Sequence, residues 1–110
     1  MELLDAIQNT YDLLDRSIKS LRTTSQAYAE AEKNYKILLR TESLKLRDEG
    51  MAVGMITLTC YGIPSVAEAR FKRDIAQANY QANQEAINAY KLQLRLLDNQ
   101  MNREWTNTRD

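Results

Sequence analysis

Residues 50–65 of the chain read GMAVGMITLTCYGIPS and separate two long segments that are rich in charged side chains. This stretch holds all three glycines and the only proline of the 110 residues. Its central part, Met51 to Tyr61, has eleven residues without a charge, most of them apolar. A connection this long and apolar is not typical of a free loop. We therefore expect residues 50–64 to form a short helical or irregular element, either buried against the rest of the protein or covered by a partner.

The segment before this stretch predicts one long helix over residues 2–49. It contains neither Gly nor Pro, and its apolar residues follow the four-three spacing of a coiled coil. RTTS at 22–25 is its poorest helix-forming part, but the spacing keeps its phase there, which favours a continuous helix over a break. Gly50 lies where a helix end accepts a positive φ. The predicted packing positions are Leu4, Ile7, Tyr11, Leu14, Ile18, Leu21, Tyr28, Tyr35, Leu39 and Leu46, interrupted by Ser25, Glu32 and Glu42.

The segment after the stretch predicts a second helix over residues 65–105, followed by a short polar tail, 106–110. Ser65 and Glu68 have the spacing of a capping box, in which the hydroxyl and the carboxylate each bind an orphan backbone N–H. The same four-three spacing then continues to the end of the helix. Its packing positions are Val66, Ala69, Arg73, Ala76, Tyr80, Asn83, Ile87, Tyr90, Leu94, Leu97 and Met101.

Together these elements predict a single all-α domain, residues 1–110, built as an antiparallel helical hairpin. Folding the chain about the middle of its connection sets Glu42 near Arg73 and Glu32 near Asn83. Several leucines lie outside both repeats and widen the apolar face, so we expect an oligomeric helical bundle, with scattered surface leucines as the alternative. They are Leu3, Leu13, Leu38, Leu44, Leu92 and Leu96.

The residue types for common catalytic and metal sites are missing. The chain has no histidine and one cysteine, Cys60. Its apolar surroundings predict that Cys60 is buried and packs as a small hydrophobic residue. A single cysteine cannot form a disulfide within the chain, which favours a reducing compartment. We therefore expect no enzyme activity, no cofactor and no metal. The acidic start of the chain differs from a signal peptide, and eleven apolar residues are too few to cross a bilayer, so we expect a cytoplasmic protein without membrane association.

Charge argues against nucleic acid as a partner. Fifteen basic and fifteen acidic side chains cancel, whereas a nucleic-acid-binding protein usually presents a basic face. A basic strip on the second helix remains the alternative, and it would consist of Arg70, Lys72, Arg73, Lys91 and Arg95.

Three parts of the sequence resemble known proteins: AYAEAEKNYK, LRDEG and the long run VAEARFKRDIAQANYQANQEAINAYKLQLRLLDNQMNREW. Between Ala27 and Trp105 the chain resembles small helical proteins of temperate phages and prophages of Gram-positive bacteria. Their genes tend to lie near recombination and replication functions. The resemblance implies no catalytic residue.

We therefore expect a non-enzymatic phage or prophage protein that forms homo-oligomers and binds a phage or host protein in the host cytoplasm. The alternatives are an accessory nucleic-acid-binding protein of a recombination or replication module, and a small inhibitor of a host protein. Trp105 either covers the end of the bundle or anchors a partner. The candidate interface residues are Met55, Ile56, Leu58, Tyr61 and Trp105.

Overall fold

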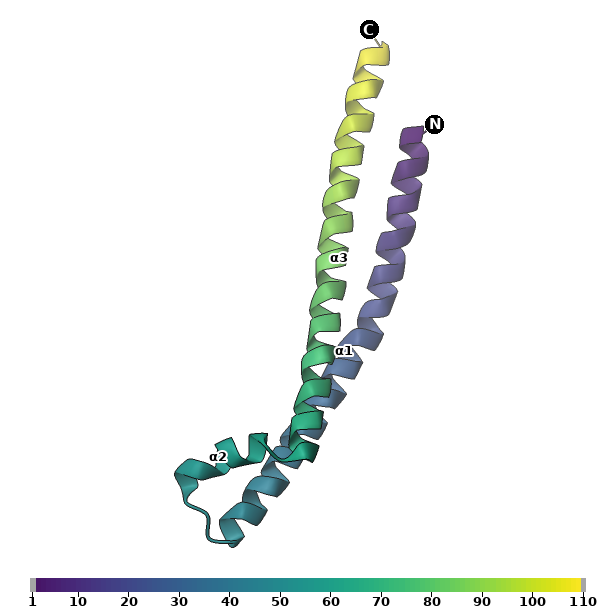
Figure 1. The fold of residues 1–110 in the computed structure, drawn as a ribbon. Coiled ribbons are helices and arrows are strands. Elements are labelled where there is room, and N and C mark those ends of the chain that lie inside the picture. The colour runs from purple at the N-terminus through teal and green to yellow at the C-terminus, as the bar shows by residue number, and fades with distance from the viewer. Residues whose placement is uncertain (1, 110) are drawn as a thin grey trace. The chain divides into compact units, whose positions relative to one another are not determined.

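The computed structural model describes residues 2–109, and over that range it contains three helices and no strand (Figure 1). Helix α1 spans Glu2–Asp48, α2 spans Val53–Tyr61 and α3 spans Pro64–Arg109. The predicted all-α fold, with two long helices and a short apolar helix between them, is confirmed. Met1 and Asp110, the outermost residues of the predicted domain and tail, lie outside the described residues.

The chain divides into two compact units, each of which combines a part of α1 with a part of α3. The terminal unit consists of Met1–Thr23 and Gln81–Asp110, and the connection unit consists of Thr24–Tyr80. Inside each unit α1 and α3 run antiparallel. In the terminal unit the Asn83 side-chain amide donates a hydrogen bond of 2.8 Å to the Ser17 carbonyl. In the connection unit the rings of Tyr28 and Tyr80 stack with their centroids 5.8 Å apart.

Helix α1 is continuous through residues 22–25, as the phase of its repeat predicts. Glu2 and Asp5 lie in its first turn, where negative charge suits the positive end of the helix dipole. Gly50 ends the helix with a φ of 91°. Its N–H donates to the Arg47 carbonyl, and the next N–H, of Met51, reaches back to Leu46. This is a Schellman motif, and it satisfies carbonyls that the helix end would otherwise leave without donors.

Helix α2 buries one face and exposes the other. Ile56 and Cys60 point inward, and Cys60 has no exposed surface. The Cys60 Sγ lies 3.4 Å from the Ser43 Oγ of α1, so this end of α2 lies beside the last turns of that helix. The short helical element expected at residues 50–64 is thus present, and Figure 1 shows how it leads from the end of α1 to the start of α3.

The two ends of α3 differ from the prediction. The helix begins at Pro64, and the Ile63 carbonyl accepts its first hydrogen bond from the Ala67 N–H at 2.9 Å. Ser65 therefore lies inside the first turn and does not cap the helix, because proline already suits the first helical position. At the other end, α3 continues to Arg109. The predicted tail is helical over its described residues, since no Gly or Pro follows Trp105 to stop it.

The predicted packing face of α3 agrees with the observed burial. Val66, Ile87 and Leu94 are buried, and the remaining positions of that repeat are partly buried.

The packing face of α1 agrees with the prediction over most of the helix and differs at three positions in its first half. The predicted positions that are buried or partly buried are Ile7, Leu14, Leu21, Tyr28, Tyr35, Leu39 and Leu46. Leu4, Tyr11 and Ile18 were expected to pack but are exposed. The residues that precede them in the sequence, Leu3, Thr10 and Ser17, are buried or partly buried in their place. Thr10 and Ser17 have small side chains, and the Asn83 amide of α3 reaches the Ser17 carbonyl. The Thr10 hydroxyl is satisfied inside its own helix, since it donates to the Ala6 carbonyl at 2.8 Å.

The predicted pairing of the helices is also displaced. Arg73 was expected near Glu42, but its guanidinium lies 4.6 Å from the ring centroid of Tyr35. Asn83 was expected near Glu32, but it bonds to Ser17. The end of α2 lies beside Ser43, before the end of α1, and only Gly62 and Ile63 separate α2 from α3. Helix α3 therefore starts beside α1 well before α1 ends. The fold-back is therefore not centred on the connection.

Candidate protein interface

The ionisable residues form local pairs on single helices. Asp15 pairs with Lys19 at 2.8 Å, and this contact raises the pKa of Lys19 through a hydrogen bond and charge attraction. Glu68 pairs with Lys72 at 4.0 Å. Among residues 2–109, no three metal-ligating side chains gather at one place. Such exposed pairs along one helix are typical of solvated surfaces, where each contributes little to stability.

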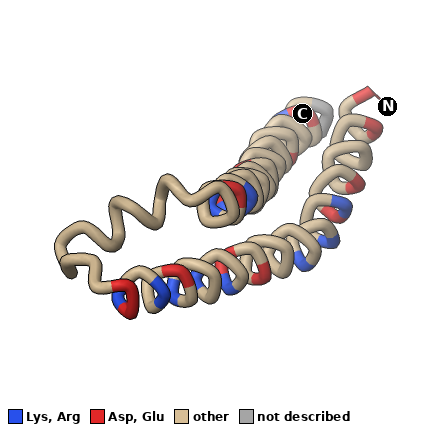
Figure 2. Tube along the Cα trace, turned by 60° about the horizontal axis from the view of Figure 1, so that its bottom comes forward, with Lys and Arg blue, Asp and Glu red and all other residues tan. Residues whose placement is uncertain are grey.

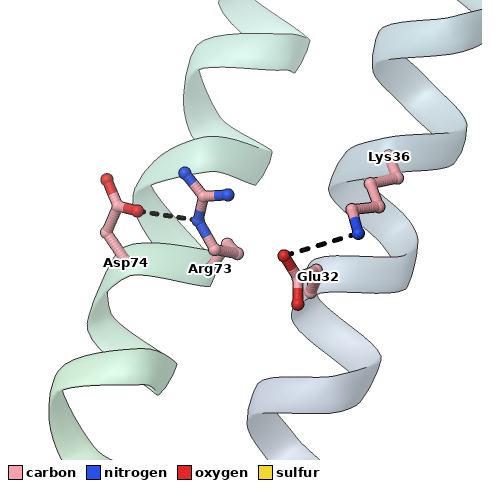
Figure 3. Close-up of polar contacts among 4 residues, drawn as sticks. All are labelled: Glu32, Lys36, Arg73 and Asp74. Atoms are coloured by element: carbon pink, nitrogen blue, oxygen red, sulfur yellow. Dashed lines mark hydrogen bonds and ion pairs between the residues drawn. The ribbon is translucent and has the colours of Figure 1, made fainter.

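Arg73 belongs to the packing between α3 and α1. Its Nε donates a hydrogen bond of 2.7 Å to the Asp74 carboxylate, which raises the pKa of Arg73 above its usual value. Figure 3 shows its side chain beside that of Glu32, which comes from α1 and pairs with Lys36 at 3.7 Å. The guanidinium also covers the ring of Tyr35. This inward position agrees with the place of Arg73 in the α3 repeat.

The residues of the predicted basic strip have separate surroundings. Arg70 covers the ring of Tyr61 at 4.4 Å, Lys72 pairs with Glu68, and Arg73 packs against α1. Lys91 and Arg95 belong to the terminal unit and are exposed.

The outer face of α2 is an apolar surface, which we call the α2 patch. It consists of Met55 and Leu58, whose exposed fractions are 55% and 68%. Val53 is 81% exposed as well, but it lies at the start of the helix on the side of Ile56, which is three residues further on. The patch and the buried residues Ile56 and Cys60 lie on different sides of one helix, so the exposed side chains do not hold α2 in place. Figure 2 shows that α2 carries no charge, whereas the helices that flank it do.

A groove lies next to the α2 patch, between α1 and α2. Its apolar part includes Leu44 and Val53, and two basic residues, Arg40 and Arg47, also line it. Ser43, Ile56 and Thr57 complete the lining. An apolar groove with two basic residues suits a segment that combines apolar and acidic side chains.

The five candidate interface residues differ in their positions. Met55 and Leu58 lie in the α2 patch, but Ile56 is buried on the inner face of the same helix. Tyr61 is half-buried beneath Arg70. Trp105 is exposed on α3. It belongs to the terminal unit, whereas the other four residues belong to the connection unit.

Tyr11 and Ile18, in the terminal unit, form a second group of exposed apolar residues that the sequence analysis does not predict. Tyr11 and Ile18 were assigned to packing because large apolar residues define a coiled-coil repeat most clearly. The signal that could have corrected this is the second series at seven-residue spacing, Thr10, Ser17, Thr24 and Ala31.

Within the described residues, no helix combines the length and the apolar character that crossing a bilayer requires. The fold and the exposed surfaces define the class of this chain: an all-α protein with two long helices that pack antiparallel and a short apolar helix between them. Comparison of the chain with models of known protein families, with curated proteins and with solved structures finds no match.

Proposed function

We propose that this chain is a non-enzymatic interaction protein of a temperate phage or prophage, which self-associates and binds a protein partner in the host cytoplasm. The α2 patch is the observation that carries the proposal. Its two large apolar side chains, and Val53 at the start of the same uncharged helix, are left in water. A partner that covered them would gain roughly 1.5–3 kcal/mol for each side chain that it buried fully.

The groove beside the patch supports a protein partner. Arg40 and Arg47 would pair with acidic side chains, while Leu44 and Val53 would receive apolar ones. This combination of an apolar centre and a charged rim is the usual composition of a protein–protein interface. The phage origin is supported by the sequence resemblance between Ala27 and Trp105.

Affinity capture from a lysate of a Gram-positive host tests the proposal, with the wild-type chain and Leu58→Asp as baits. A charge in the patch should abolish capture of the specific partner and leave the helix content unchanged, because Leu58 is exposed. Ala67→Asp is the matched control, since it adds the same charge at an exposed position of α3 in the same unit. Equal capture by wild type and Leu58→Asp would contradict the proposal.

A further inference from the structure

The terminal unit has an apolar groove with acidic borders on α1. Tyr11, Leu14 and Ile18 supply its apolar side chains, and Asp12 and Asp15 complete its lining. Tyr11 is 59% exposed and Ile18 is 48% exposed, although both have the spacing of packing residues. Both carboxylates are also exposed. We call these five residues the acidic groove.

The same unit has an apolar ridge with basic borders on α3. Leu92 and Leu96 are four residues apart, so they lie one turn apart on the same side of the helix. They are 52% and 59% exposed. Lys91 and Arg95 precede them with the same spacing and form a parallel pair of exposed cations. We call these four residues the basic ridge.

The acidic groove and the basic ridge match in three respects. Each presents two exposed apolar side chains, each has two charges beside them, and the charges are of opposite sign. Two complementary surfaces on one unit allow a pair of chains related by a two-fold axis to make the same contact twice. A reciprocal contact would cover both surfaces on both chains, whereas an unrelated partner would have to match each of them separately.

We propose that a second copy of this chain covers the acidic groove with its basic ridge, and that the first copy does the same in return. This inference rests on the proposed self-association and names its interface. Leu92 and Leu96 then pack against Tyr11, Leu14 and Ile18, while Lys91 and Arg95 pair with Asp12 and Asp15.

The contact between Asp15 and Lys19 does not oppose this arrangement. Both side chains of that pair are more than half exposed, and an exposed pair within one helix contributes little to stability. Asp15 can therefore share or exchange its partner at small cost. The carboxylate of Asp12 accepts a hydrogen bond of 3.1 Å from Gln8, which is exposed as well.

Exchange of the charges tests the interface by light scattering. One variant carries Asp12→Lys with Asp15→Lys, and the other carries Lys91→Glu with Arg95→Glu. Each variant alone places like charges at both contacts, so its dimer should be weakened by about 100-fold or more and the chain should be monomeric. An equal mixture restores opposite charges at both contacts and should form dimers. Circular dichroism checks that each variant remains helical.

Two further variants separate the interface from general charge effects and from misfolding. Lys33→Glu with Lys36→Glu makes the same change of charge at exposed positions of the connection unit and should leave the dimer unchanged. Leu92→Gln with Leu96→Gln changes two exposed leucines without altering charge, and it should weaken the dimer even if a charge-exchanged chain fails to fold.

The outcomes distinguish this inference from the proposed function. A wild-type chain that is monomeric at about 100 µM, where even a weak specific dimer would form, overturns this inference and the proposed self-association together. Dimers that persist in both charge-exchanged variants, or a mixture that stays monomeric, overturn only the reciprocal contact. Capture of a partner through the α2 patch is unaffected by either result.

Discussion

Gly50 shows how a single residue determines where the long helix α1 ends. Its φ of 91° lies in a region that L side chains rarely adopt, and no neighbouring atom comes within 4 Å of the position that a Cβ would occupy. The requirement for glycine is therefore conformational and not a matter of space. Gly54, inside α2, has equally open surroundings but no positive φ.

We expect opposite effects from the same substitution at these two glycines. Gly50→Ala should lower the free energy of unfolding by about 1–2 kcal/mol, because a Cβ is strained at positive φ. Gly54→Ala should raise it by about 0.5–1 kcal/mol, because alanine loses less entropy than glycine in a helix. Urea unfolding followed by circular dichroism measures both changes. Effects of the same sign at the two positions would contradict the assigned conformations.

At the scale of the element, α2 combines two roles on opposite faces. Its inner face, with Ile56 and Cys60, packs inside the connection unit, and its outer face is the α2 patch. The helix has no side-chain cap at Ala52 and no charge, so few polar contacts hold it in place. Its position depends on the burial of its inner face, which is why residues two apart in sequence should respond differently to the same change.

Ile56→Asp and Leu58→Asp test this division. Ile56→Asp should lower the free energy of unfolding by about 3 kcal/mol or more, because it buries an unpaired charge. Leu58→Asp should change it by less than about 1 kcal/mol, since the side chain is exposed. Thermal unfolding of the two variants at equal concentration measures the difference. A similar loss of stability in both would mean that the α2 patch is part of the core.

At the scale of the whole molecule, burial is thin in both units. Among the described residues, the buried ones of the terminal unit are Thr10, Ile87 and Leu94, and those of the connection unit are Tyr35, Ile56, Cys60 and Val66. Many large apolar side chains are exposed in the same chain. Small cores of this kind stabilise a chain only weakly. Association of copies would add buried surface and hence stability.

Thermal unfolding should therefore depend on protein concentration. For a chain that unfolds from a dimer, a rise in concentration of about a hundredfold adds about 2.7 kcal/mol to the stability of the folded state. The melting temperature of a dimer of this size should then rise by roughly 5–10 °C. Differential scanning calorimetry over that range measures it. A constant melting temperature would indicate that the folded chain unfolds as a monomer.

The sequence predicts helix content and the face of α3 well, because both depend on local pattern. Val66, Ile87 and Leu94 are large residues at regular spacing, and they are buried where the repeat places them. The face of α1 is harder to predict, because large residues at Tyr11 and Ile18 compete with small ones at Thr10 and Ser17. Which series packs depends on how closely α3 approaches, and that distance is a tertiary property.

The candidate interface is predicted only in part, for a related reason. The apolar character of residues 51–61 indicates that this segment is either packed against the protein or covered by a partner. The spacing of its apolar residues fits both a strand and a helix, so it does not assign Ile56 and Leu58 to opposite faces. The exposure of Leu92 and Leu96 could be inferred from their positions outside the α3 repeat. The surface with acidic borders on α1 could not, because Tyr11 and Ile18 occupy packing positions of the repeat and are nevertheless exposed.

The complete burial of Cys60 gives the protein an internal reporter of its own motion. It is the chain's only thiol, and a reagent can reach its sulfur only when α2 moves away from Ser43 on α1. The rate of thiol labelling therefore measures how often this helix opens, without a probe having to be introduced. A partner bound over the α2 patch would hold α2 in place and slow that rate, although it binds the opposite face of the helix. Labelling of this one sulfur therefore measures whether the patch is occupied.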